Sequence, residues 1–159
     1  MIQFSPLKTT NRETLSEITR ELDVEMGFDD LQIADAMKLQ CFSVLDGETH
    51  LGYCLFLIME NSVAHLKQIY IKPTERKFKL GDGLFRAVLN SLEIHGVNQV
   101  VATGKSEEMA FYRHEGMISV EPEVLEKISA DINAADFSQF VFLESIKAFF
   151  SKPCKGHKK

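Results

Sequence analysis

The sequence predicts an α/β fold, with a mixed and mostly antiparallel central sheet of six to seven strands that is flanked by helices. Two observations lead to this prediction. Three apolar segments in the first half of the chain are joined by tight turns, which is the pattern of an antiparallel meander. A strand, an amphipathic helix and a second short strand then follow, and a right-handed crossover of this kind makes its two strands parallel.

Length and charge limit the classes of protein to consider. The chain has 159 residues, which is enough for one domain with a substantial core. Its formal net charge of −5 argues against nucleic acid as a partner, because phosphate binding needs a broad basic surface. No apolar run reaches the roughly 18 residues of a membrane span, and the N-terminus lacks a cationic region before an apolar core. We therefore expect a cytoplasmic protein with no membrane partner.

The three cysteines are an odd number and show no C-x-x-C spacing. This pattern predicts neither a disulfide framework nor a metal site. Cys41 and Cys54 are interpreted as small buried apolar residues.

The N-terminal part predicts one strand and two helices. The segment from Ile2 to Leu7 suggests a short first strand. Thr10 and Glu13 have the spacing of a capping box, and apolar residues repeat on one helical face as far as Leu22, so a helix of about 13 residues is expected. Asp29 precedes a second apolar repeat and predicts a second helix. The apolar repeats are expected to pack these helices on the core.

The meander comprises three strands, Cys41 to Leu45, Leu51 to Met59 and Val63 to Ile71, with turns at Asp46-Gly47 and Asn61-Ser62. Asp-Gly is a strong hairpin signal. The middle strand is apolar at successive positions, which predicts that both faces of the sheet are covered.

The crossover follows the meander. Apolar residues repeat at helical spacing from Leu80 to Leu92, and Gly96 marks the end of this helix. Gln99 to Thr103 is then expected to form a short buried strand. Because the connection contains a helix, this strand should lie parallel to the one that ends at Ile71.

The sequence after Thr103 predicts further helices and strands. A helix should be capped by Ser106 and end at Gly116, with acidic residues in its first turn. Met117 to Val120 predicts a strand, Pro122 to Ala130 a helix and Phe137 to Leu143 a final strand. Residues 1–150 are thus expected to form a single domain, and residues 151–159, which carry four lysines, a basic and flexible tail.

A candidate anion site lies between the strand that ends at Ile71 and the helix that begins near Leu80. A strand that leads directly into a helix leaves the first N–H groups of the helix unpaired and exposes the positive end of its dipole. Arg76, Lys77 and Lys79 add positive charge there. A glycine such as Gly81 lets a ligand approach the backbone closely.

Two familiar phosphate-binding loops do not match this segment. The P-loop requires Gly-Lys-Ser/Thr, whereas Gly81 is followed by Asp82 and Gly83. The dinucleotide fingerprint requires a third glycine at the position of Arg86.

Arg76 to Gly81 instead resembles motif A of the GNAT superfamily of acyl-CoA N-acyltransferases, Gln/Arg-x-x-Gly-x-Gly/Ala after a strand and a short turn. Lys79 stands where the family usually has its first glycine, so the backbone at this position must suit a residue with a side chain. Phe111 to Met117 resembles the family's motif B, F-Y-x-x-x-G-F. The two motifs, in the family's order, are more specific together than either alone. The resemblance covers Thr10 to Val120.

The resemblance implies the GNAT fold, in which two parallel strands splay apart, and acetyl-CoA as co-substrate without a metal. The loop and the helix start would hold the pyrophosphate of coenzyme A, with expected contacts from Arg76, Lys77, Phe78, Lys79, Leu80, Gly81 and Asp82. The pantetheine arm would lie along the preceding strand, where a backbone N–H of Ile69, Tyr70 or Ile71 would polarise the thioester carbonyl.

The resemblance also suggests two catalytic residues. Tyr112 takes the position of the family's general acid, which gives a proton to the departing thiolate. Alternatively, it is a packing aromatic beside Phe111. His65 occupies the position at which the histone-acetylating branch carries a glutamate base, and a histidine titrates near neutrality. It could instead be a half-exposed strand histidine, with ordered water accepting the amine proton.

The implied function is an N-acetyltransferase that moves the acetyl group of acetyl-CoA directly to a primary amine of a small molecule or a protein. The alternative comes from another class: a domain that binds acyl-CoA as a sensor or scaffold without turnover. The acceptor cannot be read from the sequence, because acceptor sites are built from loops and early helices with no fixed chemistry. A homodimer is left open.

Overall fold

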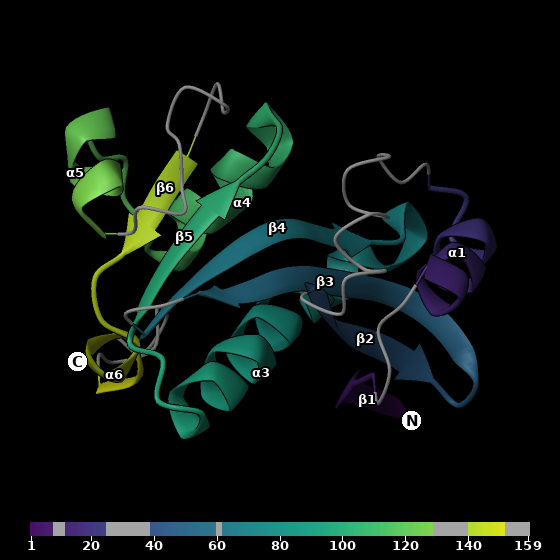
Figure 1. Ribbon diagram of the computed structural model, residues 1–159. Coiled ribbons are helices and arrows are strands. Elements are labelled where there is room, and N and C mark those ends of the chain that lie inside the picture. The colour runs from purple at the N-terminus through teal and green to yellow at the C-terminus, as the bar shows by residue number, and fades with distance from the viewer. Residues whose placement is uncertain (8–11, 25–38, 60–61, 129–139, 152–159) are drawn as a thin grey trace, which may run out of the picture.

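The computed structural model describes residues 1–7, 12–24, 39–59, 62–128 and 140–151 (Figure 1). Within these residues six strands form one sheet in chain order: β1 (Ile2–Pro6), β2 (Leu39–Asp46), β3 (Thr49–Met59), β4 (Val63–Ile71), β5 (Gln99–Thr103) and β6 (Phe140–Leu143). Every neighbouring pair is antiparallel except β4 and β5, which are parallel. The predicted fold class is confirmed.

Helices cover both faces of the sheet, as Figure 1 shows for α1 (Arg12–Glu21) and α3 (Leu80–Ile94). The side chains of β3 alternate between the two. Cys54 and Phe56 pack in the cluster that contains α3, whereas Tyr53 and Leu55 pack in the cluster that contains α1. A strand buried on both faces accounts for the continuous apolar sequence of β3.

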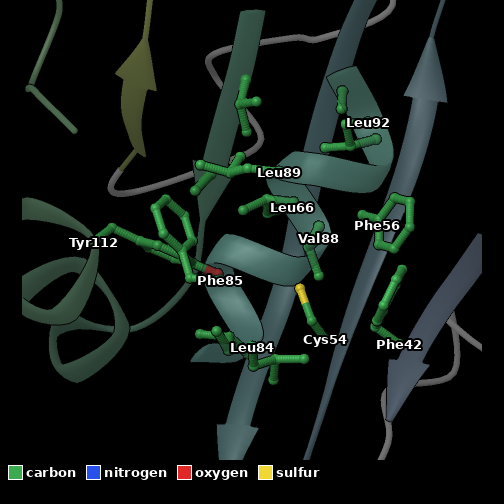
Figure 2. Close-up of a cluster of buried hydrophobic side chains, with 14 of the residues drawn as sticks. Phe42, Cys54, Phe56, Leu66, Leu84, Phe85, Val88, Leu89, Leu92 and Tyr112 are labelled. Atoms are coloured by element: carbon green, nitrogen blue, oxygen red, sulfur yellow. The ribbon is translucent and has the colours of Figure 1, made fainter. Parts of the chain in front are cut away.

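The helix α3 supplies much of the core. Its buried residues repeat at helical spacing: Leu80, Leu84, Phe85, Val88, Leu89 and Leu92. Figure 2 shows several of them above the sheet, together with Tyr112 from α4 (Ser106–Glu115). Full burial of one such side chain stabilises the fold by about 1.5–3 kcal/mol. This packing fixes the N-terminus of α3 relative to β4.

The parallel strands separate part-way along β4. Their pairing runs from Val63 opposite Gln99 to Leu66 opposite Ala102 and ends there. In the ladder with β3, Lys67 is an extra residue of β4, because Leu66 pairs with Phe56 and the next pair joins Gln68 to Leu55. A β-bulge of this kind bends its strand and increases the local twist. The bulge therefore turns β4 away from β5 directly after their last shared pair.

A short 3₁₀ helix, η2 (Pro73–Phe78), connects β4 to α3. The described residues also form the helices α5 (Pro122–Ile128) and α6 (Ile146–Ser151), and α6 lies against α3. The sequence did not predict α6, which includes Ser151, the first residue of the expected tail. Among the described residues, no helix is both long and apolar enough to cross a membrane.

Two local predictions are wrong. Ser106 does not cap α4: it is already helical, and the cap residue is Lys105, whose N–H donates to the Glu108 carboxylate at 3.1 Å. Met117 to Val120 forms no strand, because Ile118 makes only an isolated bridge with Phe142. The predicted end of α4 at Gly116 is confirmed, and this glycine has a φ of 115°.

Several predictions fall outside the described residues. They are the capping residue Thr10, the second helix after Asp29, the turn residue Asn61, residues 129–130 of the helix after Pro122, residues 137–139 of the last strand, and residues 152–159 of the tail.

Candidate active site

A cleft of about 830 Å³ lies where β4 has left β5. Ile69 and Ile71 line it from β4. The turn before α3 and its first two turns contribute Arg76, Lys79, Gly81, Asp82 and Arg86. The helix α4 contributes Glu107, Glu108, Phe111, His114 and Glu115. Leu143 of β6 and Phe149 of α6 complete the wall, together with Gly116.

The N-terminus of α3 faces this cleft. Gly83 donates its N–H to the carbonyl of Lys79 at 3.2 Å, so the three preceding N–H groups come before the first intrahelical bond. At Gly81, an added Cβ would come within 3.0 Å of the Phe111 ring. The glycine therefore lets α4 pack closely against the start of α3, a packing role in addition to the predicted ligand approach.

The backbone of Lys79 has a conformation that is typical of glycine. Its φ of 57° and ψ of 26° lie in the left-handed region, where a residue with a Cβ costs about 1 kcal/mol. The loop thus keeps the conformation that the family's glycine would favour, and the lysine side chain is exposed at the cleft.

The side chain of Arg76 is hydrogen-bonded to the end of β4. Its Nε donates to the carbonyl of Ile71 at 2.8 Å, and its guanidinium lies 5.5 Å from the centre of the Tyr70 ring. Tyr70 itself packs beside the cluster that contains α1, so its side chain is on the face opposite α3. Tyr70 is not among the residues that line the cleft. The side chain of Leu80 is buried in the core.

Asp82 makes polar contacts with two neighbours in the cleft. The Nε of Arg86 lies 3.2 Å from each carboxylate oxygen of Asp82, and the guanidinium is 5.0 Å from the centre of the Phe149 ring. Burial acts to raise the pKa of Asp82, but hydrogen bonds with Glu115 and Arg86 lower it below its ordinary value. Glu115 has a side chain that is only 7% exposed. On this wall, Asp82 therefore contacts one acidic and one basic side chain.

Tyr112 is fully buried and is not among the residues that line the cleft. The centre of its ring lies 6.1 Å from that of Phe85, which Figure 2 shows beside it. The ring of Phe111 is 5.7 Å away. Its hydroxyl has no hydrogen-bond partner among the described residues. Burial, and then the nearby Cys54 and Glu108, raise the pKa of Tyr112 well above its ordinary value.

His65 lies in the part of β4 that still pairs with β5, and the cleft lining does not include it. Its side chain is buried, not half-exposed, and its Nε2 is 2.7 Å from the Oγ1 of Thr103. Burial, followed by the charge of Lys67, lowers the pKa of His65 to about 4. The structure therefore does not retain the near-neutral titration expected of a histidine.

Glu108 spans the gap between the separated strands. Its Oε2 accepts the backbone N–H of Ile69 at 3.2 Å, and its Oε1 accepts the N–H of Lys105. Burial raises the pKa of Glu108 despite these two hydrogen bonds. In the sequence, Glu108 is one of the acidic residues of the first helical turn, where an acidic side chain suits the helix dipole. The available signal was its position four residues before Tyr112, which places both on one face of α4.

Comparison with known families agrees with this geometry. A family model described as the acetyltransferase (GNAT) family matches residues 8–117. The match spans more than half of the chain, so the protein belongs to the GNAT acetyltransferase family. No curated protein matches the chain by sequence.

Solved structures show the same fold at low sequence identity. An acetyltransferase of the GNAT family from Staphylococcus aureus has a TM-score of 0.68 at 14% identity, over 89% of this chain and 98% of that one. PaiA N-acetyltransferase from Thermoplasma acidophilum, solved with coenzyme A, has a TM-score of 0.61 at 16% identity, over 91% and 99%. The ribosomal-protein-S18-alanine N-acetyltransferase from Escherichia coli has 0.61 at 15%, over 89% and 91%.

Proposed function

We propose that this protein is an N-acetyltransferase that moves the acetyl group of acetyl-CoA directly to a primary amine of a small molecule or a protein. One observation carries the proposal: the cleft opens where the parallel strands separate, between the N-terminus of α3 and the helix α4. The coenzyme A bound to the Thermoplasma structure and the alanine named for the Escherichia coli enzyme support a coenzyme A donor and an amine acceptor.

The start of α3 fits the phosphates of coenzyme A. The first N–H groups of a helix and its dipole favour an anion, and Lys79 adds an exposed positive charge beside Gly81. The cleft volume falls within the range of about 300–1,000 Å³ that is typical of ligand pockets. We therefore assign pyrophosphate binding to the segment from Arg76 to Asp82.

The free edge of β4 fits the acyl arm. Lys72 donates its N–H to the carbonyl of Leu51 in β3. Because successive N–H groups of a strand alternate in direction, the N–H of Tyr70 also points toward β3. Ile69 and Ile71 then point their N–H groups to the side that β5 has left. These two groups are the candidates to polarise the carbonyl that a bound thioester supplies.

Tyr112 is the candidate general acid. Its buried hydroxyl without a partner among the described residues is unusual, since most buried polar groups are hydrogen-bonded. Tyr112 is not a lining residue of the cleft in the free protein, so the role requires that the sulfur of a bound thioester reach the hydroxyl behind the lining, where it would give the hydroxyl a partner and receive its proton. The raised pKa keeps the hydroxyl protonated at neutral pH, so that its proton is available as negative charge develops on sulfur during cleavage of the C–S bond.

One observation favours the second candidate function, a sensor or scaffold that binds acyl-CoA without turnover. The N–H of Ile69 already donates to Glu108, and three further carboxylates line the same cleft, those of Asp82, Glu107 and Glu115. The carboxylates lower the complementarity of the cleft to a pyrophosphate in both functions. The occupied N–H of Ile69 separates the two, because a donor that is already bonded opposes turnover and does not oppose binding of the cofactor. Turnover decides between the two functions.

The test is a screen of small amines and peptide N-termini for release of free thiol from acetyl-CoA, with mass detection of the amide. We expect thiol and amide to appear in equal amounts with at least one class of amine. Binding of coenzyme A without turnover of any amine would support the sensor. Absence of binding and of turnover would overturn both functions.

A further inference from the structure

We propose that Glu108 is the general base, the carboxylate that accepts a proton from the amine as it attacks the acetyl group. This inference rests on the proposed function and assigns the catalytic group for which the sequence offered His65 or water. It starts from the contact of Glu108 with Ile69 across the separated strands.

The position of Glu108 is defined from two sides. Its Oε2 takes the N–H of Ile69 on β4, and its Oε1 takes the N–H of Lys105 before α4. Both Glu108 and Ile69 line the cleft. The N–H of Ile69 would hold the thioester carbonyl. The Glu108 carboxylate that is bonded to it therefore lies within a few ångströms of the carbonyl carbon that the amine attacks.

The two carboxylate oxygens of Glu108 behave differently when a thioester carbonyl accepts the hydrogen bond of the Ile69 N–H. The Oε1 keeps its bond with Lys105, which holds the side chain in place. The Oε2 loses its partner and is left beside the incoming carbonyl, which is where a proton acceptor for the amine is needed. The free protein thus keeps the donor of Ile69 satisfied until a substrate replaces the carboxylate.

The electrostatic surroundings suit a base. Burial, and to a lesser degree Glu107, raise the pKa of Glu108, while the N–H groups of Lys105 and Ile69 and the charge of Lys105 oppose that rise. On the other side, burial is the main cause that raises the pKa values of Cys54 of β3 and Tyr112 of α4, and the charge of Glu108 raises both further. A carboxylate with a raised pKa accepts a proton more readily at neutral pH than an ordinary one.

The proton transfers balance with these two side chains. As the amine lone pair forms the new C–N bond, Glu108 accepts one proton from that nitrogen. As the C–S bond breaks and its electron pair leaves on sulfur, Tyr112 donates one proton to that sulfur. Glu108 then returns its proton to Tyr112, so an amine and a thioester become an amide and a thiol with both residues restored.

His65 is less suited to this task. It is buried, bonded to Thr103 and absent from the cleft lining, and its pKa of about 4 makes it a weak acceptor. The two candidates can be separated experimentally, because they lie on different elements and each can be changed alone.

The test compares Glu108→Gln with wild type, using His65→Gln as the rival and Glu93→Gln as the control. Glu93 is exposed near the end of α3 and outside the cleft. In Glu108→Gln, which keeps the size of the side chain, kcat/KM should fall about 100-fold and the acidic limb of its pH profile should disappear. The Kd for coenzyme A should change less than about threefold, because a base is not needed for binding. Each profile is measured with amines of different basicity, so that the amine's own titration is recognised.

A second readout does not depend on turnover. The backbone amide resonance of Ile69 should shift on titration of Glu108 in the free protein, and Glu108→Gln should abolish this shift. Acetyl-CoA should abolish it as well, whereas coenzyme A without the acetyl group should not. An Ile69 amide that responds identically to the two ligands would overturn the inference.

The remaining outcomes are also decisive. A Glu108→Gln variant with the wild-type rate and pH profile would overturn the role of Glu108 and leave the acetyltransferase function intact. Loss of the acidic limb in His65→Gln alone would assign the base to His65. A wild-type protein that acetylates no amine overturns both the function and this role.

Discussion

The carboxylate of Glu108 accepts a hydrogen bond from the backbone N–H of Ile69, with an O···N distance of 3.2 Å, across the gap that opens where β4 and β5 separate. The contact joins α4 to the part of β4 that no longer pairs with β5. It occupies a donor that the family's chemistry would direct at a thioester carbonyl. In the free protein, the proposed base therefore occupies the donor that we assign to the thioester carbonyl.

Tyr112→Phe tests the general acid. The substitution keeps the ring packing and removes the proton, so kcat should fall by about 100-fold or more, while affinity for coenzyme A barely changes. The ligand-free variant should also be more stable by about 1 kcal/mol, because a buried hydroxyl without a partner is removed. Steady-state kinetics and thermal unfolding measure the two effects. Wild-type turnover with chemistry limiting would leave motif B as a structural resemblance only.

Lys79→Gly tests the motif A departure. Removal of the side chain relieves a left-handed backbone but makes the unfolded chain more flexible, so stability should change by less than about 1 kcal/mol. Affinity for coenzyme A should stay the same or weaken by about 1 kcal/mol, the scale of an exposed charge contact. Ser62→Gly is the matched control, since Ser62 has a similar φ of 60° and lies outside the cleft. A large gain in affinity would show that Lys79 obstructs the site and would favour the sensor.

His65 predicts a pH dependence of stability. Its folded pKa of about 4 is below the ordinary value of 6.5, so the unfolded chain takes up the proton first as the pH falls. The stabilisation is complete above pH 6.5 and is lost toward pH 4, by about 3 kcal/mol in all. Chemical unfolding across this range should show a smaller loss for His65→Gln than for wild type.

The control for this measurement is His95→Gln, which changes an exposed histidine just after α3. It should lose stability with falling pH as the wild type does. Identical pH curves for wild type and His65→Gln would mean that the histidine is not held neutral by the fold.

Local patterns in the sequence predicted the two strands and the helix that position the candidate site. The strand from Val63 to Ile71, the helix from Leu80 and the strand from Gln99 to Thr103 are present with the predicted bounds. Periodicity and turn residues act within a few positions, so they can be read from one sequence. The motif spacing likewise predicted that the N-terminus of α3 belongs to the site.

The walls of the cleft could not be predicted in the same way. The bulge at Lys67, the contact between Glu108 and Ile69 and the position of Phe149 all depend on segments far apart in the chain. Ser106 has the propensity of a cap, yet the N–H of Lys105 bonds to a glutamate one turn ahead, so the helix is one residue longer than its composition suggests.

The most direct test of the central claim, that the cleft at the start of α3 binds coenzyme A, is thermal and chemical unfolding of the protein with and without coenzyme A. At a hundredfold excess over Kd, the ligand should stabilise the wild type by about 2.7 kcal/mol. The shift should be largely lost in Gly81→Glu, reduced less in Gly81→Ala and retained in Asn90→Glu, which places the same charge at an exposed position of α3. Unchanged unfolding of the wild type in saturating coenzyme A would contradict the account.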